Sequence, residues 1–214
     1  KEKRMHLFSL LTRLRQVCCD PALLPDQEHG PVSHSGKLQS LTKRLAEAFE
    51  GGSKVVVFSQ FVQFLRRAKT VVKAEFPDIP QVELTGSTID RERPVEQFTN
   101  IEGAGVFFIS LRAGGTGLNL QMADYVFLLD PWWNPAVEAQ AIDRVHRIGQ
   151  SKRVIVYRMI TKGTIEERIE RLKSQKGQLF TDLLSGLDSP SGMLSQFGDL
   201  QDLIALDDDS VVEE

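Results

Sequence analysis

The stretch KVVVFS at residues 54–59 decides the fold class of this chain. It is a short, continuous apolar run that follows a glycine pair, and such a run is typical of a β-strand buried on both faces. Four further strands are predicted, at residues 81–84, 106–110, 123–130 and 153–160. The stretches between them have helical apolar spacing. Strands that alternate with helices predict an α/β fold with an open, mostly parallel sheet covered on both faces.

Helices are also predicted outside the sheet region. Residues 3–17 carry an apolar residue at about every third position, with basic residues between them, and Pro21 ends this helix. A second long helix is predicted from Thr164 to about residue 184. Its start resembles a capping box, because Thr164 is followed three residues later by Glu167.

In an open parallel sheet, ligands bind beyond the carboxyl ends of the strands. The loops that follow the first four predicted strands are polar, so we expect them to share one edge. They are Ser59-Gln60, Gly86-Ser87-Thr88, residues 110–116 and residues 132–134. Their hydroxyl, amide and backbone N–H groups suit phosphate contacts that do not read sequence. Each loop alone is also explained as an ordinary turn.

The stretch SLRAGGTGLNL, residues 110–120, places three glycines between a strand and a helix start. Glycine lets backbone amides approach a phosphate, and successive N–H groups form an anion-binding nest. Arg112 adds positive charge, and the Asn119 amide can bind a ribose hydroxyl. The competing interpretation is a glycine-rich turn that serves packing alone.

The stretch DPWWNP, residues 130–135, puts two tryptophans on a loop at the same predicted edge. Aromatic side chains there can stack on bases or pack against a sugar–phosphate backbone. The alternative is that Trp132, Trp133 or both pack in the core or at a domain interface.

A helix is predicted over residues 136–146, and the stretch QAIDRVHRIGQ, residues 140–150, is expected to be helical with it. On a helix, Gln140, Asp143, Arg144 and Arg147 share one face. The two guanidiniums then form a pair of forks suited to bidentate contact with phosphate oxygens, and Asp143 can hold Arg147. The competing interpretation is a solvated face with a weak ion pair.

Composition excludes several protein classes. The 214 residues are 41% hydrophobic and 26% charged, which is ordinary for a globular protein, and no apolar run is long enough to cross a bilayer. The net charge of −3 means that any nucleic-acid contact must come from local patches. The adjacent Cys18 and Cys19 fit a reducing, intracellular compartment, and no second ligand cluster accompanies them as a metal site would require. None of the four histidines is expected to act as a base.

Taken together and in this order, the stretches LTRLRQVCCDPALL, KVVVFSQF, LTGSTIDRER, FISLRAGGTGLNL, DPWWNP and QAIDRVHRIGQ resemble the motif series of the Swi/Snf-type ATPases of helicase superfamily two. The resemblance runs from about residue 10 to residue 184 and matches the second, C-terminal RecA-like lobe. It implies a three-layer αβα fold with a brace helix after the lobe.

The resemblance implies a role for each matching residue. Arg144 and Arg147 would be arginine fingers that reach the γ-phosphate of ATP across a cleft between two lobes. The other nucleotide-binding residues would be Gly117, Asn119, Gln140 and Asp143. The residues that would follow one strand of duplex DNA are Ser59, Gln60, Gly86, Ser87, Thr88, Ser110, Arg112, Gly114, Gly115, Thr116 and Trp133.

The chain departs from the family pattern in one respect. It contains no GxxxxGK phosphate loop and no DEAH-type acidic box. ATP and Mg²⁺ would therefore be held mainly by a first lobe that this sequence lacks. We expect the chain to be one lobe of a longer enzyme and to be inactive in ATP hydrolysis by itself.

The sequence thus predicts the C-terminal motor lobe of an ATP-dependent translocase on double-stranded DNA, a chromatin-remodeller-like ATPase. Its partners would be duplex DNA, the N-terminal RecA-like lobe of the same chain, and a protein cargo such as a transcription or repair complex. The alternatives are a non-catalytic DNA-binding or interaction module that retains the fold, and an RNA helicase lobe. The protein would be intracellular, in the cytoplasm and nucleoid if prokaryotic and in the nucleus if eukaryotic.

Four regions are predicted along the chain. Residues 1–35 form an N-terminal helix and connector, residues 36–162 the RecA-like lobe, and residues 163–186 the brace helix. Residues 187–214 form a linker, a short helix and an acidic tail that is partly disordered.

Overall fold

The computed structural model describes residues 2–24, 35–114, 118–132, 134–146, 153–171 and 173–174. Within them, one parallel sheet has the strand order β2-β3-β1-β4-β5. The strands are β1 (Lys54–Ser59), β2 (Gln81–Leu84), β3 (Gly105–Ser110), β4 (Tyr125–Leu128) and β5 (Ile155–Arg158). All five predicted strands are present, and the predicted α/β fold is confirmed. The last two strands are shorter than the sequence indicated.

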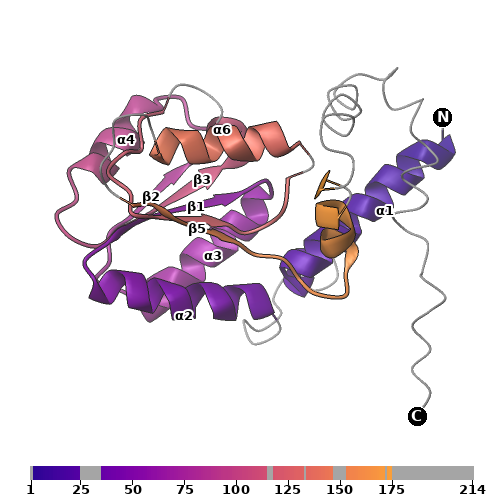
Figure 1. The fold of residues 1–214 in the computed structure, drawn as a ribbon, viewed down its shortest axis with the longest axis horizontal. Coiled ribbons are helices and arrows are strands. Elements are labelled where there is room, and N and C mark those ends of the chain that lie inside the picture. Colours follow the sequence, from indigo (N-terminus) through magenta and orange to yellow (C-terminus); the bar gives the residue numbers. More distant parts are fainter. Residues whose placement is uncertain are drawn as a thin grey trace, which may run out of the picture.

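Helices cover both faces of the sheet (Figure 1). One face carries α2 (Gly36–Glu50) and α3 (Val62–Glu75), and the other carries α4 (Glu92–Thr99), α5 (Leu111–Gly114) and α6 (Pro135–Val145). Successive residues of β1 alternate between them: Val55 and Val57 face the first helical layer, whereas Val56 and Phe58 face the second. This explains why the central strands are apolar throughout.

Two helical segments lie beyond the carboxyl end of the sheet. The first is α1 (Glu2–Cys19), followed by η1 (Pro21–Leu23). The second, the C-terminal helix, comprises residues 165–171 and 173–174. Its start shows half of the predicted capping pattern: Thr164 Oγ1 accepts from Glu166 N at 3.2 Å, whereas Glu167 Oε2 accepts from Gly163 N at 2.8 Å and not from Thr164 N as a capping box requires. Among the described residues, no helix combines the length and apolar character needed to span a membrane.

The predicted helix over residues 136–146 is present as α6, but the helical continuation to residue 150 is wrong. The α6 helix ends at Val145, and His146 has the extended angles φ −103° and ψ 90°. The Arg144 carbonyl, which a longer helix would use internally, accepts instead from the Leu120 N–H at 3.1 Å. A tertiary contact therefore ends the helix. Arg147 lies outside the described residues, and so does the face that it was proposed to share with Asp143.

The two-sided core makes a testable stability prediction. Phe108 in β3 is fully buried, and its replacement by alanine leaves a cavity beneath α2 and α3. We expect Phe108→Ala to lower the free energy of unfolding by about 3–5 kcal/mol in urea denaturation. The matched control is Ile89→Ala, because Ile89 is 101% exposed and its removal leaves no cavity. Equal losses in both variants would contradict the layered core.

Candidate functional site

The polar loops predicted to share one edge do meet at the carboxyl ends of the strands. Because the sheet is parallel and Ser59 pairs with Ser110, β1 and β3 end side by side. The strand order places the ends of β2 and β4 on either side of them. The predicted common edge is therefore confirmed. The binding role of its residues is a separate question, which depends on where each side chain points.

Ser59 points into the lobe. Its side chain is 0% exposed, and its hydroxyl donates to Asp130 Oδ1 at 2.5 Å. The Gln60 backbone N–H donates to the two Asp130 carboxylate oxygens at 3.2 and 3.3 Å, and the Gln60 side-chain Oε1 accepts from Arg15 at 3.1 Å. This corrects the expectation that the Ser59 hydroxyl faces a bound strand. Ser59 and Gln60 instead fix the buried Asp130.

The Asp130 carboxylate is the centre of this edge. It is 1% exposed, and burial raises the pKa of the Asp130 carboxyl above its ordinary value. The positive charge of Arg15, followed by the hydrogen bond from Ser59, opposes that rise in the pKa. Burial conversely lowers the pKa of the Arg15 guanidinium, and Asp130 is the main group that opposes it. The two groups therefore stabilise each other in their charged forms.

The segment that follows β4, residues 129–132, is held by charged side chains from three helices. We call it the β4 exit. Lys37 Nζ of α2 donates to the Leu129 carbonyl at 2.7 Å. Arg15 Nη2 of α1 donates to the Pro131 carbonyl at 2.5 Å. On the far side, the Trp132 N–H donates to Glu138 Oε1 of α6 at 2.6 Å.

The turn after β2 is the predicted loop whose groups reach the surface. Gly86 and Ser87 are exposed and Thr88 is half-buried. The turn is closed by its own hydroxyls: Thr85 and Ser87 Oγ atoms lie 2.9 Å apart, and Thr88 Oγ1 accepts from Thr85 N at 3.1 Å. The exposed groups of this turn are therefore accessible to a ligand without rearrangement of the fold.

The remaining predicted edge residues are only partly defined. Ser110 is buried, and its hydroxyl has no hydrogen-bond partner among the described residues. Gly114 ends α5, and the side chain of Arg112 is outside what the structure describes. Gly115, Thr116, Gly117 and Trp133 lie outside the described residues. Trp132 packs against the core layer of α4 and α6. This agrees with the alternative that one of the two tryptophans serves packing.

Arg144 and Asn119 form a second group at the opposite end of the sheet. Arg144 lies in the last turn of α6, where its carbonyl accepts from Leu120 N. Leu120 lies five residues before the start of β4 at Tyr125. The Arg144 Nε atom is buried and has no hydrogen-bond partner in the described part of the chain. Asn119 is exposed, and its Oδ1 accepts from Gln121 N at 3.4 Å. Gln140 and Asp143 are exposed on α6.

Sequence reasoning missed the charged residues that hold the β4 exit. Lys37 and Arg15 each lie on a predicted amphipathic helix, where a basic residue is ordinarily expected to face solvent. Glu138 carried no signal, because one acid in the first turn of a helix is common. Asp130 could have been found, since it follows a buried strand at the edge already predicted to carry the site.

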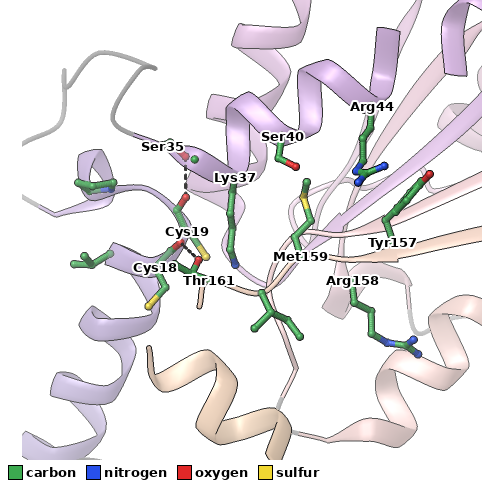
Figure 2. Close-up of a pocket in the computed structure, with 14 residues that line it drawn as sticks. Cys18, Cys19, Ser35, Lys37, Ser40, Arg44, Tyr157, Arg158, Met159 and Thr161 are labelled. Carbon is green, nitrogen blue, oxygen red and sulfur yellow. Dashed lines mark hydrogen bonds between the residues drawn. The ribbon is translucent and has the colours of Figure 1, made fainter. Parts of the chain in front are cut away.

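A pocket of about 430 Å³ adjoins this edge between the end of α1, the start of α2 and the end of β5. Figure 2 shows Cys18, Cys19, Ser40, Met159 and Thr161 around it. Ser35 and Thr161 hydroxyls donate to the Cys19 and Cys18 carbonyls, both at 2.9 Å, and so cap the end of α1. The pocket thus lies beside the β4 exit. No group of three His, Cys, Asp or Glu side chains in the described ranges could hold a metal ion.

The chain is similar to proteins of one known family. The family "Helicase conserved C-terminal domain" matches residues 36–149. A Mycoplasma pneumoniae protein named "Uncharacterized ATP-dependent helicase" is 36% identical over 179 residues, which are 84% of this chain and 17% of that protein. The human "SWI/SNF-related matrix-associated actin-dependent regulator of chromatin subfamily A member 1" is 40% identical over 178 residues, 79% of this chain and 17% of that protein. The chain therefore spans only about a sixth of either relative.

Solved structures show the same likeness. The "Sulfolobus solfataricus SWI2/SNF2 ATPase core in complex with dsDNA" matches with a TM-score of 0.75 and 33% identity, over 96% of this chain and 43% of that one. The "Sulfolobus solfataricus SWI2/SNF2 ATPase C-terminal domain" matches with a TM-score of 0.71 and 29% identity, over 94% of this chain and 81% of that one. The predicted family and the predicted RecA-like C-terminal lobe are both confirmed by these matches.

The two cysteines make a testable prediction. Burial raises the pKa of both thiols, that of Cys19 well above its ordinary value and that of Cys18 less strongly. Because the thiolate is the reactive form, we expect both to react with iodoacetamide at pH 8 far more slowly in the folded chain than in urea. Peptide mass spectrometry would measure the two rates.

The same shifts set the sign of a pH effect. A thiol pKa that is higher in the folded state favours folding below the unfolded value, and this contribution is lost as the pH rises from about 8.5 towards the folded value. The free energy of unfolding should therefore fall with pH in that range. A Cys18→Ala, Cys19→Ala double variant is the control, and it should show a shallower decline. Fast native alkylation of both thiols would contradict this assignment.

Proposed function

Because this chain belongs to the SWI2/SNF2 family of superfamily-two ATPases, as their helicase C-terminal domain, we propose that it is the second motor lobe of an ATP-dependent translocase that moves along duplex DNA. Its relatives include proteins named ATP-dependent helicases, one of them a "Putative ATP-dependent helicase/translocase" of Bacillus subtilis. A related ATPase core is described in complex with double-stranded DNA. These names support the proposal, and the residues of this chain give it a mechanism.

The observation that carries the proposal is the environment of Arg144. A guanidinium donor that is buried without an acceptor loses stability unless some other group satisfies it. Among the described residues, the Nε atom of Arg144 is in this situation, beside the contact between Leu120 and the end of α6. In the proposed two-lobe protein, the guanidinium turns towards the cleft and a phosphate oxygen of the bound nucleotide supplies the acceptor. The always-charged, planar guanidinium suits that contact and stabilises the charge that develops during phosphoryl transfer.

Neighbouring residues complete the proposed nucleotide-facing group. Asn119 is exposed next to the Leu120 contact, and its amide can bind a sugar hydroxyl. Gln140 and Asp143, exposed on α6, orient Arg144 and Arg147, and Gly117 allows the close approach of the sugar. ATP with Mg²⁺ is held mainly by the first lobe in this proposal. The residues of this lobe bind, orient and neutralise charge.

The proposed DNA-facing group lies at the carboxyl edge. The exposed turn with Gly86, Ser87 and Thr88 offers N–H and hydroxyl groups to one strand of the duplex. The glycine-rich segment adds Ser110, Arg112, Gly114, Gly115 and Thr116, and the loop after β4 adds Trp133. Ser59 and Gln60 support this surface from inside through Asp130. Contacts of this kind do not read bases, which suits a motor that moves along any sequence.

The first prediction concerns hydrolysis. The 214-residue chain alone should not hydrolyse ATP measurably, because it lacks a phosphate loop. Joined in cis to a first lobe that carries one, it should gain DNA-stimulated turnover. In that two-lobe protein, Arg144→Ala should slow turnover by roughly a thousandfold with little change in DNA affinity. A coupled phosphate-release assay and fluorescence anisotropy would measure the two quantities.

The matched control for Arg144→Ala is Arg66→Ala. Arg66 is an exposed arginine on α3, on the opposite face of the sheet. Its removal should leave turnover unchanged. Turnover by the isolated chain that Arg144→Ala abolishes would contradict the two-lobe mechanism. Loss of DNA affinity without loss of turnover would contradict the assignment of Arg144 to the nucleotide.

The second prediction concerns the nucleic acid. The chain should bind duplex DNA more tightly than single-stranded DNA or duplex RNA, and its affinity should fall as salt rises, because phosphate contacts release counterions. Ser87→Asp places a negative charge on the exposed turn and should weaken duplex binding severalfold. The control is Thr70→Asp at an exposed position of α3, which should have little effect on duplex binding. Preference for RNA would favour the RNA helicase alternative, and duplex affinity without ATPase in the two-lobe protein would favour a non-catalytic module.

A further inference from the structure

The C-terminal helix contacts two of the charged residues that hold the β4 exit. At one end of the helix, Glu166 Oε1 lies 2.7 Å from Lys37 Nζ, the group that also donates to the Leu129 carbonyl. At the other end, Lys173 Nζ lies 2.8 Å from Glu138 Oε1, the atom that also accepts from the Trp132 N–H. The helix therefore reaches the β4 exit from both sides through one intermediate side chain each.

Both ion pairs are enclosed by protein. The side chains of Lys37 and Glu166 are 6% and 0% exposed, and those of Lys173 and Glu138 are each 7% exposed. Each pair has a further fixed contact on the helix side. Glu166 Oε2 accepts from Thr161 N at 2.9 Å, and Lys173 also donates to Glu170. The pairs are thus built into the fold, unlike flexible pairs on a surface.

Burial makes these contacts sensitive to the position of the helix. A charge that is buried without its partner is strongly destabilising, so it turns towards water or another acceptor. If the C-terminal helix moved away, Lys37 would be left in that state, and Glu138 would keep only the longer contact with the half-exposed Arg158. Their reorientation would release the Leu129 carbonyl and the Trp132 N–H, and the β4 exit would lose two of its fixed contacts.

We infer that the C-terminal helix sets the position of the β4 exit, and that Glu166 and Lys173 are positioning residues that act through Lys37 and Glu138. The part of this inference that concerns DNA binding rests on the proposed function, because the loop after β4 carries Trp133, which is proposed to face the DNA. A partner that bound or displaced the C-terminal helix would then alter how the lobe grips the duplex without touching the duplex itself.

The two tryptophans of the chain give this inference a direct signal. Both lie in or next to the β4 exit, at positions 132 and 133. Glu166→Gln removes the counter-charge of Lys37, and Lys173→Met leaves Glu138 with only the half-exposed Arg158, whose Nε lies 3.7 Å away. We expect both variants to shift tryptophan emission to longer wavelength and to increase acrylamide quenching, in the 214-residue chain and without DNA. Circular dichroism would show that each variant is folded.

The matched control is Lys69→Met. Lys69 Nζ lies 2.8 Å from Glu83 Oε2, the same spacing as in the Lys173–Glu138 pair, but on α3 and β2. The tryptophan emission of the Lys69→Met variant should equal that of the parent chain. The Lys69 and Glu83 side chains are 36% and 22% exposed, so this control removes a lysine charge without leaving a fully buried partner. An effect of losing any ion pair would appear in all three variants, whereas a positioning role affects only the two on the C-terminal helix.

A double-variant test separates positioning from loss of structure. Lys37→Met removes the other half of the Glu166 pair, so the Lys37→Met, Glu166→Gln chain contains no unpaired charge there. Its quenching should change by less than the sum of the two single variants. If Glu166→Gln does not fold, Lys173→Met decides alone, because in that variant Glu138 still has a second cation, Arg158, whose Nε lies 3.7 Å from Glu138 Oε2.

The DNA arm measures duplex affinity of the same variants. Energetic coupling of this kind is expected to weaken binding by about two- to thirtyfold in Glu166→Gln and Lys173→Met, and not in Lys69→Met. Unchanged tryptophan emission and quenching in both folded variants would overturn the inference. A parent chain that binds no duplex DNA would count against the proposed function alone, since the fluorescence arm would still decide whether the helix positions the β4 exit.

Discussion

Burial of charge at the end of β4 is the constraint on which this end of the lobe depends. A central strand of a parallel sheet is covered on both faces, so the chain that leaves it passes through an interior with little water. Asp130 is placed there with its charge. An unpaired buried charge costs about 3–5 kcal/mol, and the carboxylate therefore requires Arg15, Ser59 and Gln60 around it.

The same constraint joins segments that are far apart in the sequence. Lys37 and Glu166 are separated by 129 positions, and Arg15 and Pro131 by 116. The salt bridge between Arg67 and the buried Asp20 fastens the end of α1 to α3 as well. By these contacts α1 is fixed to the lobe, although it lies outside the residues matched by the helicase domain. The domain boundary placed at residue 35 stays a prediction, and these contacts join the segments on either side of it.

The sequence allowed prediction of what depends on local pattern. Apolar runs predicted all five strands, and the helices between them predicted that the strands run parallel. The prediction failed at the end of α6, where a hydrogen bond from Leu120 to Arg144 decides the boundary. It also failed for Ser59, whose inward direction depends on a carboxylate 71 positions away. Such errors share one cause, since a tertiary contact with a distant residue leaves no periodic signal in either segment.

The placement of α6 relates the two proposed groups to each other. Its first turn holds Glu138 against the β4 exit at the carboxyl edge, and its last turn holds Arg144 beside Leu120 at the other end of the sheet. An eleven-residue helix spans about 16 Å, and it is stiff over that length. The contact between Glu138 and the Trp132 N–H therefore joins the β4 exit to the same helix that carries Arg144. In the proposed motor, this one helix gives the nucleotide-facing group and the DNA-facing group a common rigid body, and the C-terminal helix acts on both through its hold on Glu138.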